Sequence, residues 1–139
     1  MKTILDIPLA GTPFRGLVLD GDFFPLAYVG VPQSHFLADM ENLQFPCHWG
    51  ITFRGLGGDG LRPAGYFWYR WDYGHSGDRI TLPPELMALL PPALSSFSQG
   101  KAWTVEEIEH DLIDVAVGLQ EACAKAKAGL DEVIDQLKV

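Results

Sequence analysis

Two histidines and two aspartates in the middle of the chain have side chains that could do chemistry. They are His48, Asp72, His75 and Asp78. Imidazole and carboxylate groups are ligands for divalent metals, and a histidine that donates to an aspartate is held in one tautomer. Without a metal, the same groups can act as catalytic acids and bases on a small substrate. Both chemistries stay open on the residues alone, as does a purely structural role in tight turns.

A predicted β-hairpin brings these four side chains together. The segments Cys47–Arg54 and Tyr66–Tyr73 alternate apolar residues with polar or small ones, and a glycine-rich loop joins them. If the hairpin is symmetric about the Asp59–Gly60 step, His48 faces Asp72 across the two strands. The turn that follows then carries the other two side chains back over the same end. This prediction depends on the register, because a slip of one residue turns the side chains to the other face.

Further residues around the hairpin are expected to bind a ligand. Thr52, Trp68 and Arg70 lie on its predicted polar face, Arg79 follows in the next turn, and His35 lies just past another predicted strand. An arginine forms strong charge-assisted hydrogen bonds with an anionic group. The sequence therefore predicts a small anionic ligand paired with Arg70 or Arg79, with a divalent metal as the other possibility.

The first hundred residues are expected to form a sheet, because short apolar runs alternate there with Gly, Pro and Asp. The predicted strands are Thr3–Leu9, Gly16–Leu19, Leu26–Val31, Trp49–Arg54 and Gly65–Tyr73. Short helices are predicted near Ser34–Met40 and from Thr81 to Leu90, and Pro92–Gly100 is expected to be a connecting loop.

A long amphipathic helix is predicted over residues 104–138. Thr104 and Glu107 match a capping box. Apolar residues then follow in steps of three and four, at Ile108, Leu112, Val115, Leu119, Ala122, Ala126, Leu130, Val133 and Leu137. An unbroken helix of this length exceeds the size of the domain. Either Gly118 or Gly129 interrupts it, with a break near Gly129 favoured, or its distal half projects and pairs with another chain.

Together these elements predict one α+β domain over residues 1–139, with an antiparallel sheet of about five strands packed by the C-terminal helix. The formal net charge is -8, with 18 acidic residues against 10 Lys and Arg, which argues against binding to a nucleic-acid backbone. No apolar run is long enough to span a membrane, and the N-terminal residues lack the pattern of a signal peptide. With two cysteines, the chain is expected to be cytoplasmic.

Three segments, taken in order, resemble an uncharacterised family of small phage and bacterial proteins. The segments are Tyr28–Pro32 with His35 shortly after, His48–Phe53, and Trp68–Asp78. They are similar to the family's segments YVGVP–His, HGG(L/I)T(F/Y) and WWxGFDxxHxGD. The chain departs from this pattern at Trp49, Arg70 and Tyr73.

A phage or prophage source implies a second class of function. The family has no established activity, so whether the chain is an enzyme stays open. The resemblance implies the alternative of an acidic interaction protein, such as an inhibitor of a host defence factor, because an acidic helix can imitate a row of phosphates. The acids concerned are Glu106, Glu107, Glu109 and Asp111. The long apolar stripe also favours a homodimer.

Overall fold

A computed structural model of the chain describes residues 1–138, without the side chains of Ala93, Leu94, Ser95 and Phe97. The described elements are β1 (Thr3–Pro8), β2 (Arg15–Leu19), β3 (Leu26–Pro32), β4 (Phe53–Leu56), β5 (Tyr66–Asp72), α1 (Pro84–Leu89), the 3₁₀-helix η1 (Pro92–Gln99) and α2 (Val105–Leu137). This arrangement confirms the α+β class and the long C-terminal helix.

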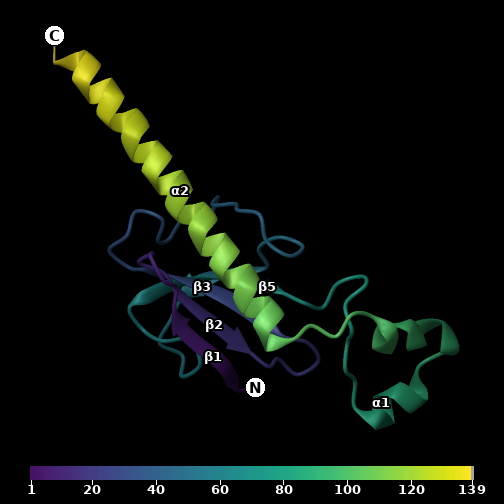
Figure 1. Cartoon of the computed structure of the whole chain (residues 1–139). Coiled ribbons are helices and arrows are strands. Elements are labelled where there is room, and N and C mark those ends of the chain that lie inside the picture. Colours follow the sequence, from purple (N-terminus) through teal and green to yellow (C-terminus); the bar gives the residue numbers. More distant parts are fainter. Residues whose placement is uncertain (139) are drawn as a thin grey trace.

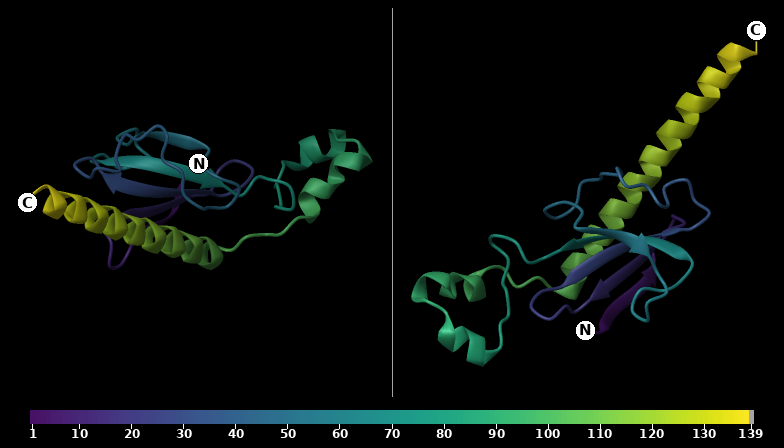
Figure 2. Two further views of the ribbon diagram at one scale, coloured as in Figure 1. Left: turned by 90° about the horizontal axis from the view of Figure 1, so that it is seen from above. Right: turned by 180° about the vertical axis from the view of Figure 1, so that it is seen from behind.

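The five strands form one antiparallel sheet in the order β1-β2-β3-β5-β4. The long β5 pairs with β3 over its whole length, from Leu26 opposite Asp72 to Pro32 opposite Tyr66. The short β4 therefore lies at the edge of the sheet. α2 crosses one face, so the domain has two layers, while the segment containing α1 and η1 lies off one end of the sheet (Figures 1 and 2).

The aromatic residues of β5 are buried on both faces of the sheet, because successive strand residues point to opposite sides. On the α2 face, Tyr69 and Trp71 pack with Ile108 and Leu112 in the larger core. On the opposite face, Trp68 lies in a second core. This second face was expected to be mixed: Trp68 is fully buried there, while Arg70 is half-buried.

α2 is continuous from Val105 to Leu137, so the predicted break near Gly129 is wrong. The predicted capping box is confirmed, since the Thr104 side chain accepts from the Glu107 amide at 3.2 Å. No described residue of α2 beyond Leu119 is buried, and the distal half projects away from the sheet (Figure 1). None of the described helices combines the length and the apolar character needed to cross a bilayer.

Two local predictions outside the sheet were wrong. The segment Ser34–Met40 forms a series of turns rather than a short helix. Pro92–Gln99 was expected to be a loop and forms η1. The predicted helix before it is confirmed in a shorter form as α1, which has proline in its first turn and ends before Pro91. Each difference concerns a segment of a few residues whose conformation depends on local turn chemistry.

Candidate functional site

The hairpin of β4 and β5 has a different register from the predicted one. Placing His48 opposite Asp72 is equivalent to placing Gly50 opposite Arg70, but the structure pairs Phe53 with Arg70, three residues further along. Trp49 and Gly50 have φ values of 59° and 87°. Extended strands require negative φ, so the chain turns at these residues and the strand begins only at Phe53. The predicted His48–Asp72 pairing is therefore wrong.

His48 pairs instead with Asp78. The His48 Nε2 atom lies 2.8 Å from Oδ2 and 3.1 Å from Oδ1 of Asp78. The indole N–H of Trp103 donates to Oδ1 at 2.8 Å, and the backbone N–H of His75 donates to Oδ2 at 3.0 Å. Asp78 is only 5% exposed. These donors give a buried carboxylate the hydrogen bonds that its removal from water requires.

The donors around Asp78 also keep it ionised. Burial, the largest influence, raises the pKa of this carboxyl group. The hydrogen bonds from His48, from the His75 amide and from Trp103 act in the opposite direction, and the net result is a lowered pKa. Because a carboxylate only accepts, the hydrogen-bond pattern assigns the proton of a neutral His48 to Nε2 and its lone pair to Nδ1.

Aromatic rings hold His48 in place. Its ring stacks on Tyr73, with centroids 4.7 Å apart and an 18° angle between the planes, and meets the Trp103 ring edge-on at 5.0 Å. The Tyr73 hydroxyl accepts from the Trp71 indole at 3.0 Å and donates to Asp111 Oδ2 at 2.8 Å. Burial raises the pKa of Tyr73, so its hydroxyl stays protonated and is not an activated nucleophile.

The second histidine–aspartate pair lies beside the first. His75 Nε2 is 3.0 Å from Asp72 Oδ1. This contact is not aligned as a hydrogen bond, and Nε2 has no hydrogen-bond partner among the described residues. The exposed ring of Trp49 stacks on His75 at 5.2 Å, and the rings of His48 and His75 are 6.3 Å apart.

The four side chains thus form two pairs rather than one ligand set. Across residues 1–138, no group of three His, Cys, Asp or Glu side chains is placed to hold a metal ion. Metal sites in proteins are commonly built from three or more such ligands. The sequence correctly predicted that these residues lie near one another, but not which histidine pairs with which aspartate.

Three of the predicted ligand-binding residues belong to the opposite face of the sheet. Trp68 is fully buried in the second core, and its indole donates to the Pro63 carbonyl at 3.0 Å. The Arg70 guanidinium lies 5.3 Å from the Phe53 ring centroid and donates to Thr52 Oγ1 at 3.3 Å. Strand alternation points Trp68 and Arg70 away from the face that carries Tyr73, so these residues do not join the His48 site.

His35 and Arg79 also lie apart from His48. The His35 ring packs between Phe14 and Phe36, its Nδ1 atom accepts from the Leu37 amide at 3.1 Å, and burial lowers its pKa. The Arg79 side chain is exposed. The arginines that were expected to pair with an anionic ligand are therefore not part of this site.

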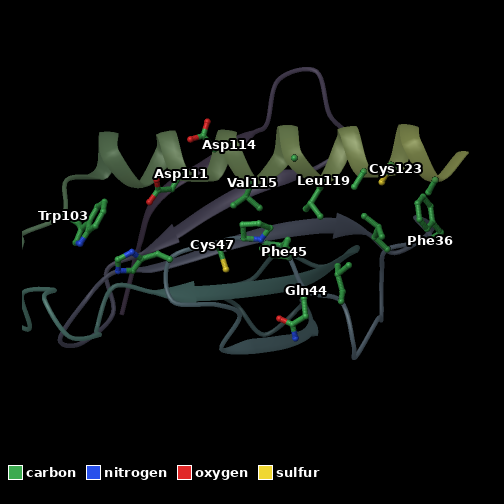
Figure 3. Close-up of a pocket in the computed structure, with 17 residues that line it drawn as sticks. Phe36, Gln44, Phe45, Cys47, Trp103, Asp111, Asp114, Val115, Leu119 and Cys123 are labelled. Atoms are coloured by element: carbon green, nitrogen blue, oxygen red, sulfur yellow. The ribbon is translucent and has the colours of Figure 1, made fainter. Parts of the chain in front are cut away.

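His48 lines an apolar groove between α2 and residues 36–48, with a volume of about 830 Å³ (Figure 3). Leu37, Phe45 and Cys47 contribute from the sheet side. Val115, Gly118, Leu119, Ala122, Cys123 and Ala126 contribute from α2. Trp103 lies at one end and Phe36 at the other (Figure 3). The carboxylates on its described walls belong to Asp111 and Asp114, and neither a lysine nor an arginine is among the described lining residues.

Sequence reasoning missed Trp103, Tyr73 and Asp111 as parts of the site. Trp103 immediately precedes the capping box of α2, and Asp111 lies about one helical turn after Glu107. Their positions relative to His48 follow from how α2 packs on the sheet. The available signal was weak: an indole N–H next to a helix start needs a hydrogen-bond acceptor once it is buried.

The two cysteines in the groove should differ in reactivity. Burial raises the pKa of Cys47 to about 11 from an ordinary value of 9.0, and it raises that of Cys123 less strongly. The thiolate is the reactive form, so at pH 8 Cys47 should react about 100-fold more slowly with iodoacetamide than an ordinary thiol. Cys123 should therefore react first. Rates measured in the single variants Cys47→Ala and Cys123→Ala test this, and equal rates for the two thiols would contradict it.

No family model matches this sequence, and neither a curated protein nor a solved structure gives a match. The resemblance to the phage and bacterial family is not tested by these comparisons and stays a prediction.

Proposed function

We propose that the protein binds a small amphipathic molecule in the groove between α2 and residues 36–48. The observation that carries this proposal is an apolar groove lined at one end by a half-buried histidine that is hydrogen-bonded to Asp78. Binding sites for small molecules are typically concave, mostly apolar, and about 300–1,000 Å³ in volume, with a few fixed polar groups that orient the ligand. The groove, at about 830 Å³, has this size and this composition.

His48 is the polar group that would orient the ligand. Asp78 occupies its Nε2–H, which leaves the Nδ1 lone pair as the acceptor for a hydrogen bond from the ligand. Stacking on Tyr73 and the contact with Trp103 fix the plane of the ring. An acceptor held in this way suits a head group that donates, such as an alcohol or an amine.

The charges around the groove favour an uncharged or cationic head group. Asp111 and Asp114 line it, and the arginines predicted to attract an anion lie elsewhere. A carboxylate or phosphate entering this groove would meet like charge. We therefore replace the expected anionic ligand by an apolar molecule with a neutral or positively charged polar end.

The alternative of an acidic protein that imitates phosphates has less support from the geometry. Glu107 belongs to the capping box and lies 2.6 Å from Lys101 Nζ, and Asp111 accepts from Tyr73. Two of the four expected acids are thus engaged within the domain.

The two cysteines are free thiols in the structure. This state suits a reducing compartment, and we include a cytoplasmic location in the proposal.

Displacement of the fluorescent amine N-phenyl-1-naphthylamine tests the proposed site. We expect the probe to bind the wild-type protein, and dodecanol and dodecylamine to displace it at lower concentration than dodecanoate does. Gly118→Leu should abolish binding because its side chain fills the groove. Gly118→Ala, which adds one methyl group at the same position, should bind the probe as the wild type does. Equal binding to both variants would contradict the proposal.

The role of His48 has its own readout within the same experiment. His48→Ala should weaken dodecanol by about tenfold, the effect of losing one hydrogen bond of about 1.4 kcal/mol. Arg70→Ala, on the opposite face of the sheet, is the matched control and should leave all affinities unchanged. If Arg70→Ala weakens binding and His48→Ala does not, the ligand site lies on the other face.

A further inference from the structure

The distal half of α2 has an apolar face that none of the described residues covers. Leu130 is 60% exposed, Val133 52% and Leu137 79%. Most of the stability of a protein helix comes from packing its apolar face rather than from helix propensity. A helix that projects this far with such a face is therefore typical of an element that packs against a partner (Figure 1).

We propose that two copies of this chain associate through the distal halves of α2, packed antiparallel about the Gly129–Leu130 step. Two independent patterns in the projecting segment support this occupant and this orientation. One is the size of the apolar residues, and the other is the arrangement of charge.

The apolar face carries small residues in its first part and large ones in its second. The small residues are Ala122, Ala126 and Gly129, and the large ones are Leu130, Val133 and Leu137. When Gly129 lies beside the partner's Leu130, Ala126 meets the partner's Val133 and Ala122 meets the partner's Leu137. Every small residue then faces a large one, which lets the two helices pack closely. Within one chain, a Cβ atom on Gly129 would meet nothing within 4 Å, so a single copy gives no packing reason for glycine there.

The charges beside this face specify the antiparallel orientation. With 100° per residue, Lys125 and Glu132 lie on one flank of the apolar face, and Lys127 lies on the other. In an antiparallel pair, equivalent flanks meet, so Lys125 approaches the partner's Glu132, and the symmetry of the pair forms this contact twice. In a parallel pair, opposite flanks meet, and Lys125 would face the partner's Lys127. Exposed charges of this kind select the orientation more than they add affinity.

Such a dimer would also border the groove. Ala122 and Ala126 line the groove, and Cys123, which follows Ala122 in α2, lies toward its end farther from Trp103 (Figure 3). The partner's Leu137 and Val133 would lie against these residues, while His48 and Gly118 remain available to a small molecule. The association itself rests on the helix and is independent of the proposed ligand.

The mass of the full-length protein in solution tests the association. Sedimentation equilibrium should give twice the chain mass of 15.3 kDa. The double variant Leu130→Glu, Val133→Glu should sediment as a single chain with an unchanged near-ultraviolet circular dichroism spectrum, because both residues are exposed. Ala128→Glu places the same charge on the opposite face and should remain dimeric. A wild-type protein that stays a single chain at up to about 100 μM would overturn the proposal.

Disulfide trapping tests the orientation. In a background with Cys47→Ala and Cys123→Ala, the variants Ala126→Cys and Val133→Cys are prepared separately and then mixed under oxidation. An antiparallel pair should give the mixed disulfide between positions 126 and 133. Disulfides between identical positions should not form, because those residues lie about 10 Å apart along the helices. Formation of identical-position disulfides alone, or of none, would overturn the proposed packing.

Discussion

Replacing Asp78 by asparagine should lower the free energy of unfolding by about 2–4 kcal/mol. The carboxylate accepts from His48, from the Trp103 indole and from the His75 amide, and it is almost fully buried. The amide of asparagine keeps one oxygen but turns an NH₂ group toward one of these donors, so a buried donor loses its acceptor. Urea denaturation followed by tryptophan fluorescence measures the loss.

The effect of this substitution should depend on pH. The pKa of Asp78 is lower in the folded protein than in the unfolded chain, so its stabilising contribution is complete above the unfolded value. It is lost as the pH falls through the lower, folded value. Asparagine does not titrate, so the stability difference between wild type and Asp78→Asn should be constant near neutral pH. The difference should shrink below the ordinary aspartate pKa of about 3.9.

Asp72→Asn is the matched control. Asp72 is also largely buried, but it accepts from the Gly74 amide at 3.2 Å and its contact with His75 is not aligned as a hydrogen bond. We therefore expect this substitution to cost less than half as much as Asp78→Asn. Equal losses for the two variants, or a difference at Asp78 that does not change in acid, would show that Asp78 does not have the role assigned to it.

Gly100→Ala should destabilise the protein by about 1–3 kcal/mol through overpacking. An added Cβ would lie 2.4 Å from both the carbonyl carbon and the carbonyl oxygen of Asp78, which are backbone atoms and cannot rotate away. Lys101, the next residue, forms an isolated β-bridge with Asp78. The Lys101 N–H donates to the Gly77 carbonyl, and the Lys101 carbonyl accepts from the Arg79 N–H, each at 2.8 Å. The substitution should therefore also displace Asp78 from Trp103.

Gly118→Ala is the same substitution at another glycine, and we expect it to have the opposite effect on stability. Gly118 lies inside α2, and a Cβ there meets nothing within 4 Å. Alanine should raise the free energy of unfolding by roughly 0.5–1 kcal/mol because it restricts the unfolded chain and favours the helix. Thermal unfolding of both variants checks the pair. A Gly100→Ala protein as stable as the wild type would mean that the approach of Gly100 to Asp78 is not needed.

Local patterns in the sequence were sufficient for the fold class and for most elements. The strands β1, β2, β3 and β5 lie within one residue of their predicted bounds, because alternation and turn residues act over short distances. The start of α2 was predictable because the capping box of Thr104 and Glu107 is a contact between residues three apart. Its continuation through Gly129 was not, since that depends on how strongly neighbouring helical residues offset one glycine.

The site itself was decided by tertiary structure. The sequence singled out His48 and Asp78, but the turn at Trp49 and Gly50 shifted the β4–β5 register and changed which aspartate His48 meets. Trp103 reaches Asp78 only because α2 packs across the sheet, which also creates the groove. Short stretches of sequence thus determine the local conformation and identify the candidate residues. Pairings between distant residues depend on register and packing, where a shift of a few residues changes every partner.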